Sequence, residues 1–131
     1  MNATEENSRH ADEQALRDIA RAYLESWLDG DGERMRSALS PSLAKRGLDY
    51  GPDYAPTGLH HVDAEYMVAS AARGPRTQFN RAITITILDV ADNIASVKVA
   101  SDPFIDYLHL AKLDGQWSIV NALYENRDPT S

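Results

Sequence analysis

The sequence predicts an α+β fold in which an antiparallel sheet is covered on one face by three N-terminal helices. Apolar residues follow a helical period in the first half of the chain and alternate with a period of two from Phe79 onward. The predicted strands also follow one another through short turns, and after residue 80 no helical segment is available to connect parallel strands.

Length and composition limit the possible classes of protein. A chain of 131 residues is about one domain, so residues 1–131 are assigned to a single domain whose polar ends, 1–10 and 127–131, are expected to be frayed. No apolar run approaches the roughly 18 residues of a membrane helix, and the polar start is not a secretory signal. The absence of cysteine fits a cytoplasmic protein. The net charge of −7 argues against binding to nucleic acid.

The first predicted helix is defined by an apolar stripe with helical spacing, formed by Leu16, Ile19, Ala20, Tyr23, Leu24, Trp27 and Leu28. Gly30 is expected to end it, because glycine accepts the left-handed conformation. Asp31 then caps a short helix that carries Met35, Ala38 and Leu39 and ends before Pro41.

The segment 47–61 is rich in glycine and proline and shows neither period, so it is predicted to be a long loop. Asp63 is expected to cap a third helix with an apolar side, and Gly74-Pro75 closes it. The apolar side consists of Met67, Val68, Ala71 and Ala72.

The next hairpin turns at 91–93. A loop of odd length pairs Ile87 with Val97 and Ile85 with Val99, whereas a two-residue loop would pair Ile87 with Lys98. The odd length is therefore predicted, because it keeps the apolar residues on one face.

The last hairpin turns at Asp114-Gly115, a pair that favours a two-residue type I′ turn. This turn would pair Leu110 with Ile119 and Leu108 with Asn121. One face then carries Asp106, Leu108, Leu110, Trp117, Ile119, Asn121 and Leu123, and is expected to be covered by the helices. The opposite face carries Ile105, Tyr107, His109, Ser118, Val120 and Tyr124. An odd turn would instead place Tyr107 and His109 beside Trp117.

Asp106 and Asn121 are the polar residues expected at the edge of the apolar chamber. A buried carboxylate must find a partner, water or a ligand, or its pKa must rise. A carboxylate in such a setting can act as a general base. In the simpler alternative, Asp106 accepts hydrogen bonds from Asn121, a tyrosine hydroxyl or a loop amide, since buried polar groups are usually satisfied internally.

Three further residues complete the candidate ligand site. Tyr23 and Trp27 lie four residues apart on the first helix, where aromatic side chains serve as core or as a shelf for a ligand. Arg46, next to Lys45, is a candidate clamp for an anionic group, although exposed charges are usually only solvated.

Other chemistry is disfavoured by the sequence. His60 and His61 are adjacent, which is not the spacing of metal ligands, and His109 is more typical of a surface or an interface than of catalysis. The chain has no glycine-rich phosphate loop and no Gly-x-Ser-x-Gly elbow. We therefore predict neither a metal site nor a cofactor.

Four segments have a recognisable order along the chain: Tyr-Leu-Glu-Ser-Trp-Leu-Asp-Gly-Asp at 23–31, Pro-Ser-Leu-Ala-Lys-Arg-Gly at 41–47, Asp-Tyr-Leu-His-Leu at 106–110 and Asp-Gly-Gln-Trp-Ser-Ile-Val-Asn at 114–121. They resemble the nuclear transport factor 2-like (NTF2-like, SnoaL-like) superfamily, and more closely its "putative lumazine-binding" branch. The resemblance covers about residues 10–126. It implies a cone-shaped, strongly curved sheet over three helices, an internal cavity, and a homodimer formed through the outer sheet faces. It supplies no agreed set of catalytic residues.

Three functional hypotheses follow. The first is a protein that binds a small molecule, a planar heterocycle, through Tyr23, Trp27, Arg46, Asp106 and Asn121. The second is an isomerase, cyclase or dehydratase that uses Asp106 as a general base. The third is a dimerisation module without a ligand.

Overall fold

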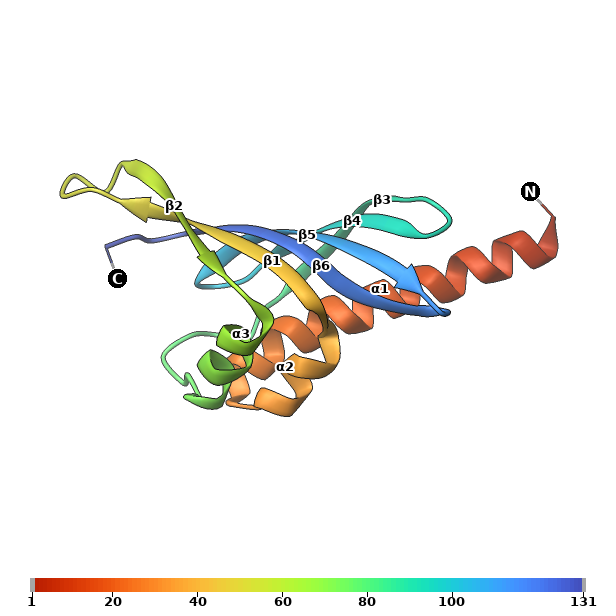
Figure 1. The fold of residues 1–131 in the computed structure, drawn as a ribbon, viewed down its shortest axis with the longest axis horizontal. Coiled ribbons are helices and arrows are strands. Elements are labelled where there is room, and N and C mark those ends of the chain that lie inside the picture. The colour runs from red at the N-terminus through yellow and green to blue at the C-terminus, as the bar shows by residue number, and fades with distance from the viewer. Residues whose placement is uncertain (1, 131) are drawn as a thin grey trace.

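The computed structural model describes residues 2–130 and shows a curved sheet with three helices gathered on one face (Figure 1). The helices are α1 (Ala3–Asp29), α2 (Gly32–Ala38) and α3 (Ala64–Ala72). The strands are β1 (Leu39–Tyr50), β2 (Pro56–Val62), β3 (Thr84–Val90), β4 (Ile94–Ala100), β5 (Phe104–Leu113) and β6 (Gln116–Asn126). The predicted α+β class is confirmed.

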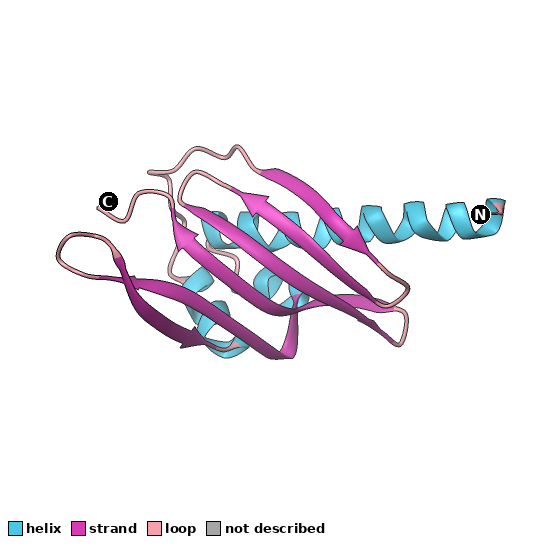
Figure 2. Cartoon of the chain, turned by 90° about the horizontal axis from the view of Figure 1, so that it is seen from above, coloured by secondary structure: helices cyan, strands magenta, loops and turns pink. Residues whose placement is uncertain are grey.

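The ends of the helices follow local hydrogen bonds. The side chain of Asn2 accepts from the backbone N–H of Glu5 at 2.9 Å, so α1 begins well before its apolar stripe. Residues 3–10, which we expected to be frayed, form the first turns of α1 and project beyond the sheet (Figure 2). Gly30 ends α1 with a φ of 82°, and Asp31 and Asp63 cap α2 and α3 as predicted.

The sheet has the strand order β2-β1-β6-β5-β4-β3 and is mixed, because β1 pairs with β6 in parallel. The prediction of a purely antiparallel sheet was wrong on this one pair. The prediction considered only strands after residue 80, and it did not include β1, which directly follows α2. The long connection from β1 to β6 contains α3 and the other four strands, and this length allows the chain to return in the parallel direction.

The predicted loop at 47–61 is a hairpin of β1 and β2, and only residues 51–55 connect the strands. Its glycines and prolines concealed the strand period. Pro41 is compatible with β1 because pairing with β6 is irregular between Leu39 and Ala44, and pairing with β2 starts only at Lys45. Leu39, expected in the second helix, is the first residue of β1.

The core lies between α1 and the sheet face that is turned toward the helices. It is one cluster, which includes Leu16, Ala20 and Leu24 from α1 and Val97, Val99, Leu108, Leu110 and Ile119 from the strands. Ile87 pairs with Val97 and Ile85 with Val99 as predicted, but an odd loop length is not the cause. Val90 pairs with Ala95 next to the turn, and a β-bulge at Leu88 then shifts the register between Ile87 and Asp89.

Candidate functional site

A pocket of about 280 Å³ lies between the helices and the four strands β2, β1, β6 and β5, and we call it the central pocket. Tyr23 and Trp27 reach it from α1, and α3 contributes its Tyr66–Ser70 side. The strands contribute Lys45, His60, Phe104, Asp106 and Tyr124. Side chains from distant parts of the sequence therefore meet in one place.

A chain of three polar groups runs along the buried side of the central pocket. Lys45 Nζ donates to Tyr23 Oη at 2.6 Å, and Tyr23 Oη donates to Asp106 Oδ1 at 2.9 Å. Lys45 is 7% exposed and Asp106 is 1% exposed. Asp106 Oδ2 is buried and has no hydrogen-bond partner among the described residues, so one carboxylate oxygen is left with an unused acceptor.

Burial shifts the pKa of each group in this chain in the direction that favours the neutral form of the group. It raises the pKa of Asp106, although Lys45 and the hydrogen bond from Tyr23 act in the opposite direction. It lowers the pKa of Lys45, against the attraction of Asp106. The pKa of the Tyr23 hydroxyl rises well above its usual value through burial and the neighbouring carboxylate. The site therefore holds an acid and a base whose charged forms are poorly solvated.

The raised pKa of Asp106 predicts how stability depends on pH. The unfolded carboxyl has an ordinary pKa of 3.8, so the stability contributed by this group is complete below that value and is lost as the pH rises through the higher folded pKa. The amide introduced by Asp106→Asn cannot ionise, so this variant should gain stability relative to the wild type as the pH rises from about 3.8 through the higher folded pKa of Asp106. Urea unfolding at a series of pH values measures the difference.

The control for this experiment is Asp92→Asn, which removes an exposed carboxylate in the β3–β4 turn. Its difference from the wild type should change little over the same range. A pH-independent difference for Asp106→Asn would contradict the raised pKa.

Aromatic side chains also line the central pocket. The ring centroids of Trp27 and Phe104 are 5.0 Å apart, and those of Phe104 and Tyr124 are 5.3 Å apart, both in edge-to-face geometry. The guanidinium of Arg76 lies 4.0 Å from the Trp27 ring and donates to the Trp27 carbonyl at 2.7 Å. This anchoring holds the Trp27 ring in position beside the pocket.

At the exposed side of the central pocket, His60 links Tyr124 to Asp49. His60 Nε2 lies 2.8 Å from Tyr124 Oη, and His60 Nδ1 lies 2.8 Å from Asp49 Oδ1. Burial, followed by the charge of Asp106, raises the pKa of Tyr124 to about 12. The rings of Tyr124 and His60 pack directly over Gly47, where a Cβ would approach Tyr124 Cε1 to 2.3 Å.

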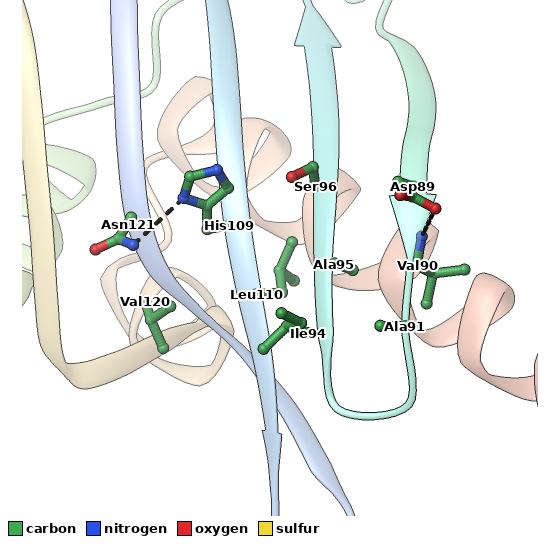
Figure 3. Close-up of a pocket in the computed structure, with 10 residues that line it drawn as sticks. All are labelled: Asp89, Val90, Ala91, Ile94, Ala95, Ser96, His109, Leu110, Val120 and Asn121. Atoms are coloured by element: carbon green, nitrogen blue, oxygen red, sulfur yellow. Dashed lines mark hydrogen bonds between the residues drawn. The ribbon is translucent and has the colours of Figure 1, made fainter.

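The structure brings three of the predicted site residues together and separates two. Tyr23, Trp27 and Asp106 line the central pocket, whereas Arg46 and Asn121 lie on the other side of the sheet. In β1 the side chains alternate, so Lys45 points to the helices and its neighbour Arg46 is exposed. Asn121 instead contacts His109, at 3.3 Å between Nδ2 and Nδ1, in an outer groove (Figure 3).

A β-bulge explains the position of Asn121. Leu110 pairs with Ile119 as predicted, but the register then shifts, so His109 pairs with Asn121 and Asp106 pairs with Tyr124. Val120 is left without a partner on β5, and every later side chain of β6 changes face. The predicted pair Leu108–Asn121 was wrong, and so were the faces of Leu123 and Tyr124.

Lys45, His60 and Tyr124 were missed as pocket residues. The alternation of Leu43, Lys45 and Gly47 could have indicated that Lys45 faces inward, had residues 39–50 been identified as a strand. His60 belonged to the segment predicted as a loop, and Tyr124 follows the bulge. These residues were missed because residues 39–50 were not identified as a strand and because the inserted residue in β6 was not recognised.

The described residues offer little for other classes of site. No group of three or more histidine, aspartate or glutamate side chains among residues 2–130 is arranged to hold a metal ion. None of the helices in the described part of the chain combines the length and the apolar character that crossing a membrane requires.

Comparisons with known proteins agree with this architecture. The family described as "Putative lumazine-binding" matches residues 11–125. An NTF2-like protein of unknown function from Shewanella baltica is 18% identical, with a TM-score of 0.66 and 98% coverage of both chains. Another from Silicibacter pomeroyi is 20% identical, with a TM-score of 0.70, covering 97% of this chain and 100% of that chain.

A more distant solved structure carries the name of an enzyme class. A ketosteroid isomerase-like protein from Erwinia carotovora is 12% identical, with a TM-score of 0.58, covering 88% of this chain and 96% of that chain. At this identity the similarity shows the fold alone. No match was found among curated proteins.

Proposed function

The chain belongs to the family described as "Putative lumazine-binding", and on that basis we propose that the central pocket binds a small planar heteroaromatic molecule. The observation that carries this proposal is the buried, unpartnered Oδ2 of Asp106. A buried acceptor without a partner is unfavourable, and an N–H or O–H of a ligand would satisfy it.

The neighbours of Asp106 define the rest of the ligand chemistry. Lys45 is linked to Asp106 through the Tyr23 hydroxyl, and its amine can donate a hydrogen bond to a ligand carbonyl. Trp27 and Phe104 offer aromatic surface for stacking. A ring with an N–H beside a C=O, as in lumazine, can donate to Asp106 Oδ2 and accept from Lys45 Nζ. A pocket volume of about 280 Å³ is in keeping with such a compact ligand.

Isothermal titration calorimetry with lumazine, supported by thermal shift with lumazines, flavins and aromatic acids, tests the proposal. We expect saturable binding that Asp106→Asn weakens at least about tenfold, because the amide cannot supply a charged acceptor to a ligand N–H. Asn121→Ala is the matched control on the outer face of the sheet and should leave the affinity unchanged. Silence with every compound, or equal affinity in wild type and Asp106→Asn, would contradict the proposal.

A second candidate is an isomerase, cyclase or dehydratase in which Asp106 is the general base. The raised pKa of this carboxyl in an apolar pocket favours proton transfer. The ketosteroid isomerase-like fold relative is compatible with such chemistry by analogy only. Mass spectrometry of the calorimetry samples separates the candidates, since a binding protein returns its ligands unchanged.

The outer sheet face supports our proposal of a homodimer. Tyr107 is 47% exposed and Leu123 is 48% exposed on this face, next to the grooves that contain Arg46 and His109. Such exposed apolar side chains are suited to an interface between two copies of the chain. Sedimentation velocity measures the assembly state. The cytoplasm is the proposed location.

A further inference from the structure

Lys45 is an unusual lysine because its amine is buried at the wall of a pocket. The chain has two other lysines, Lys98 and Lys112, and neither lines the central pocket. Lysine is seldom buried unless it is paired with an acidic group. None of the ion pairs within residues 2–130 includes Lys45.

The groups that do surround the Lys45 amine are weak partners for a positive charge. Nζ lies 2.6 Å from Tyr23 Oη, 3.4 Å from Met67 Sδ and 4.5 Å from the centroid of the Tyr124 ring. The nearest acidic group, Asp106, is reached only through the Tyr23 hydroxyl. The tyrosine rings and Asp106 favour the charged amine, whereas burial has the larger effect, lowers the pKa of Lys45 and favours the neutral amine, which is the nucleophilic form.

We propose that Lys45 is a nucleophile that forms an imine with an aromatic aldehyde or ketone held in the central pocket. This inference rests on the proposed function only in that the pocket admits a planar aromatic molecule. Trp27 and Phe104 would hold the ring, and the carbonyl carbon would face Nζ.

The neighbouring residues can carry the protons that this reaction moves. The nitrogen lone pair of Lys45 forms a bond to the carbonyl carbon, and the π electrons move to the oxygen. The nitrogen loses one proton and the oxygen gains one, which gives a carbinolamine. The remaining nitrogen proton and the hydroxyl group then leave as water, so the net products are an imine and one water. Asp106, which Lys45 reaches through the Tyr23 hydroxyl, can take up the proton from the nitrogen and return it to the oxygen along this hydrogen-bonded chain.

Reductive trapping tests the proposal on the intact chain. The folded protein is incubated with benzaldehyde or pyridine-4-carboxaldehyde and sodium cyanoborohydride at about pH 7, and peptide mapping locates the label. We expect Lys45 to be labelled at least about tenfold faster than Lys98 and Lys112. The same reaction in denaturing urea should label all three lysines evenly, because the pocket is then lost. Even labelling of the folded protein, or no label on Lys45, would overturn the proposal.

Two controls connect the reaction to the pocket. Lys45→Met keeps a long apolar side chain and should reduce total lysine labelling to the level of Lys98 and Lys112. Excess lumazine, where it binds, should slow labelling of Lys45 alone, and unchanged labelling would place the reactive amine outside the pocket. Preferential labelling of Lys45 without lumazine binding would contradict lumazine as a ligand and leave this inference standing. Lumazine binding together with even labelling would support the ligand and overturn this inference.

Discussion

Tyr23→Phe is expected to lower the free energy of unfolding by about 1–3 kcal/mol. The Tyr23 hydroxyl accepts from Lys45 Nζ and donates to Asp106 Oδ1, so its removal leaves two buried groups without their shared partner. Urea unfolding monitored by circular dichroism measures the loss. Tyr107→Phe, on the exposed outer face, is the matched control and should change stability by less than about 0.5 kcal/mol.

The same chain of polar groups can be replaced as a unit. A triple variant, Tyr23→Phe with Lys45→Met and Asp106→Leu, leaves no buried polar side-chain group unpaired at these three positions. Replacing all partners of a buried hydrogen-bonded group by well-packed apolar groups of similar shape is often neutral or stabilising. We therefore expect the triple variant to recover most of the stability lost in Tyr23→Phe. A triple variant that is less stable than Tyr23→Phe would show that the polar chain stabilises the fold rather than serving a ligand.

Gly47→Ala is the second substitution with a large expected effect. The added Cβ would meet Tyr124 Cε1 at 2.3 Å and His60 Cε1 at 2.7 Å, so both rings must move. Overpacking of this kind costs about 1–3 kcal/mol, and the hydrogen bond between His60 and Tyr124 should be lost. Urea unfolding measures the stability, and the imidazole resonances of His60 in NMR spectra report the lost contact.

Gly58→Ala on the facing strand β2 is the matched control. A Cβ at Gly58 meets its nearest atom, Asp49 Oδ2, at 3.7 Å, which is ordinary van der Waals contact. This variant should be neutral or slightly stabilising, because alanine loses less conformational entropy on folding than glycine. Equal losses in Gly47→Ala and Gly58→Ala would show that the ring packing over Gly47 is unimportant.

The helices and the start of the last hairpin were predictable from the sequence because their causes are local. Asp31 and Asp63 cap helices through their own side chains, and Gly30 ends α1 through its own backbone. The pairing of Leu110 with Ile119 follows from the two-residue turn at Asp114-Gly115. Tyr23, Trp27 and Asp106 could be placed in the pocket for the same reason, since each lies on a strongly periodic apolar face.

The missing half of the site depends on relations between distant segments. Lys45 faces the pocket because β1 pairs with β6, about 75 residues later in the chain, and no local pattern reveals that pairing. Asn121 and Tyr124 exchange faces because Val120 is an extra residue in β6. A regular alternation of apolar residues gives no indication of a bulge, so the sequence analysis extended the register correctly to Ile119 and incorrectly beyond it.

The bulge at Val120 also has an evolutionary consequence. If the bulge were lost with Val120 retained, Val120 would pair with His109, and Asn121 and Leu123 would turn toward the helices in place of Ala122 and Tyr124. Forming or losing this one bulge can thus exchange the chemical lining of the pocket while the strand order stays the same. Relatives that share this architecture can diverge in ligand through the presence or position of a bulge in one strand, without a substitution at any residue that touches the ligand.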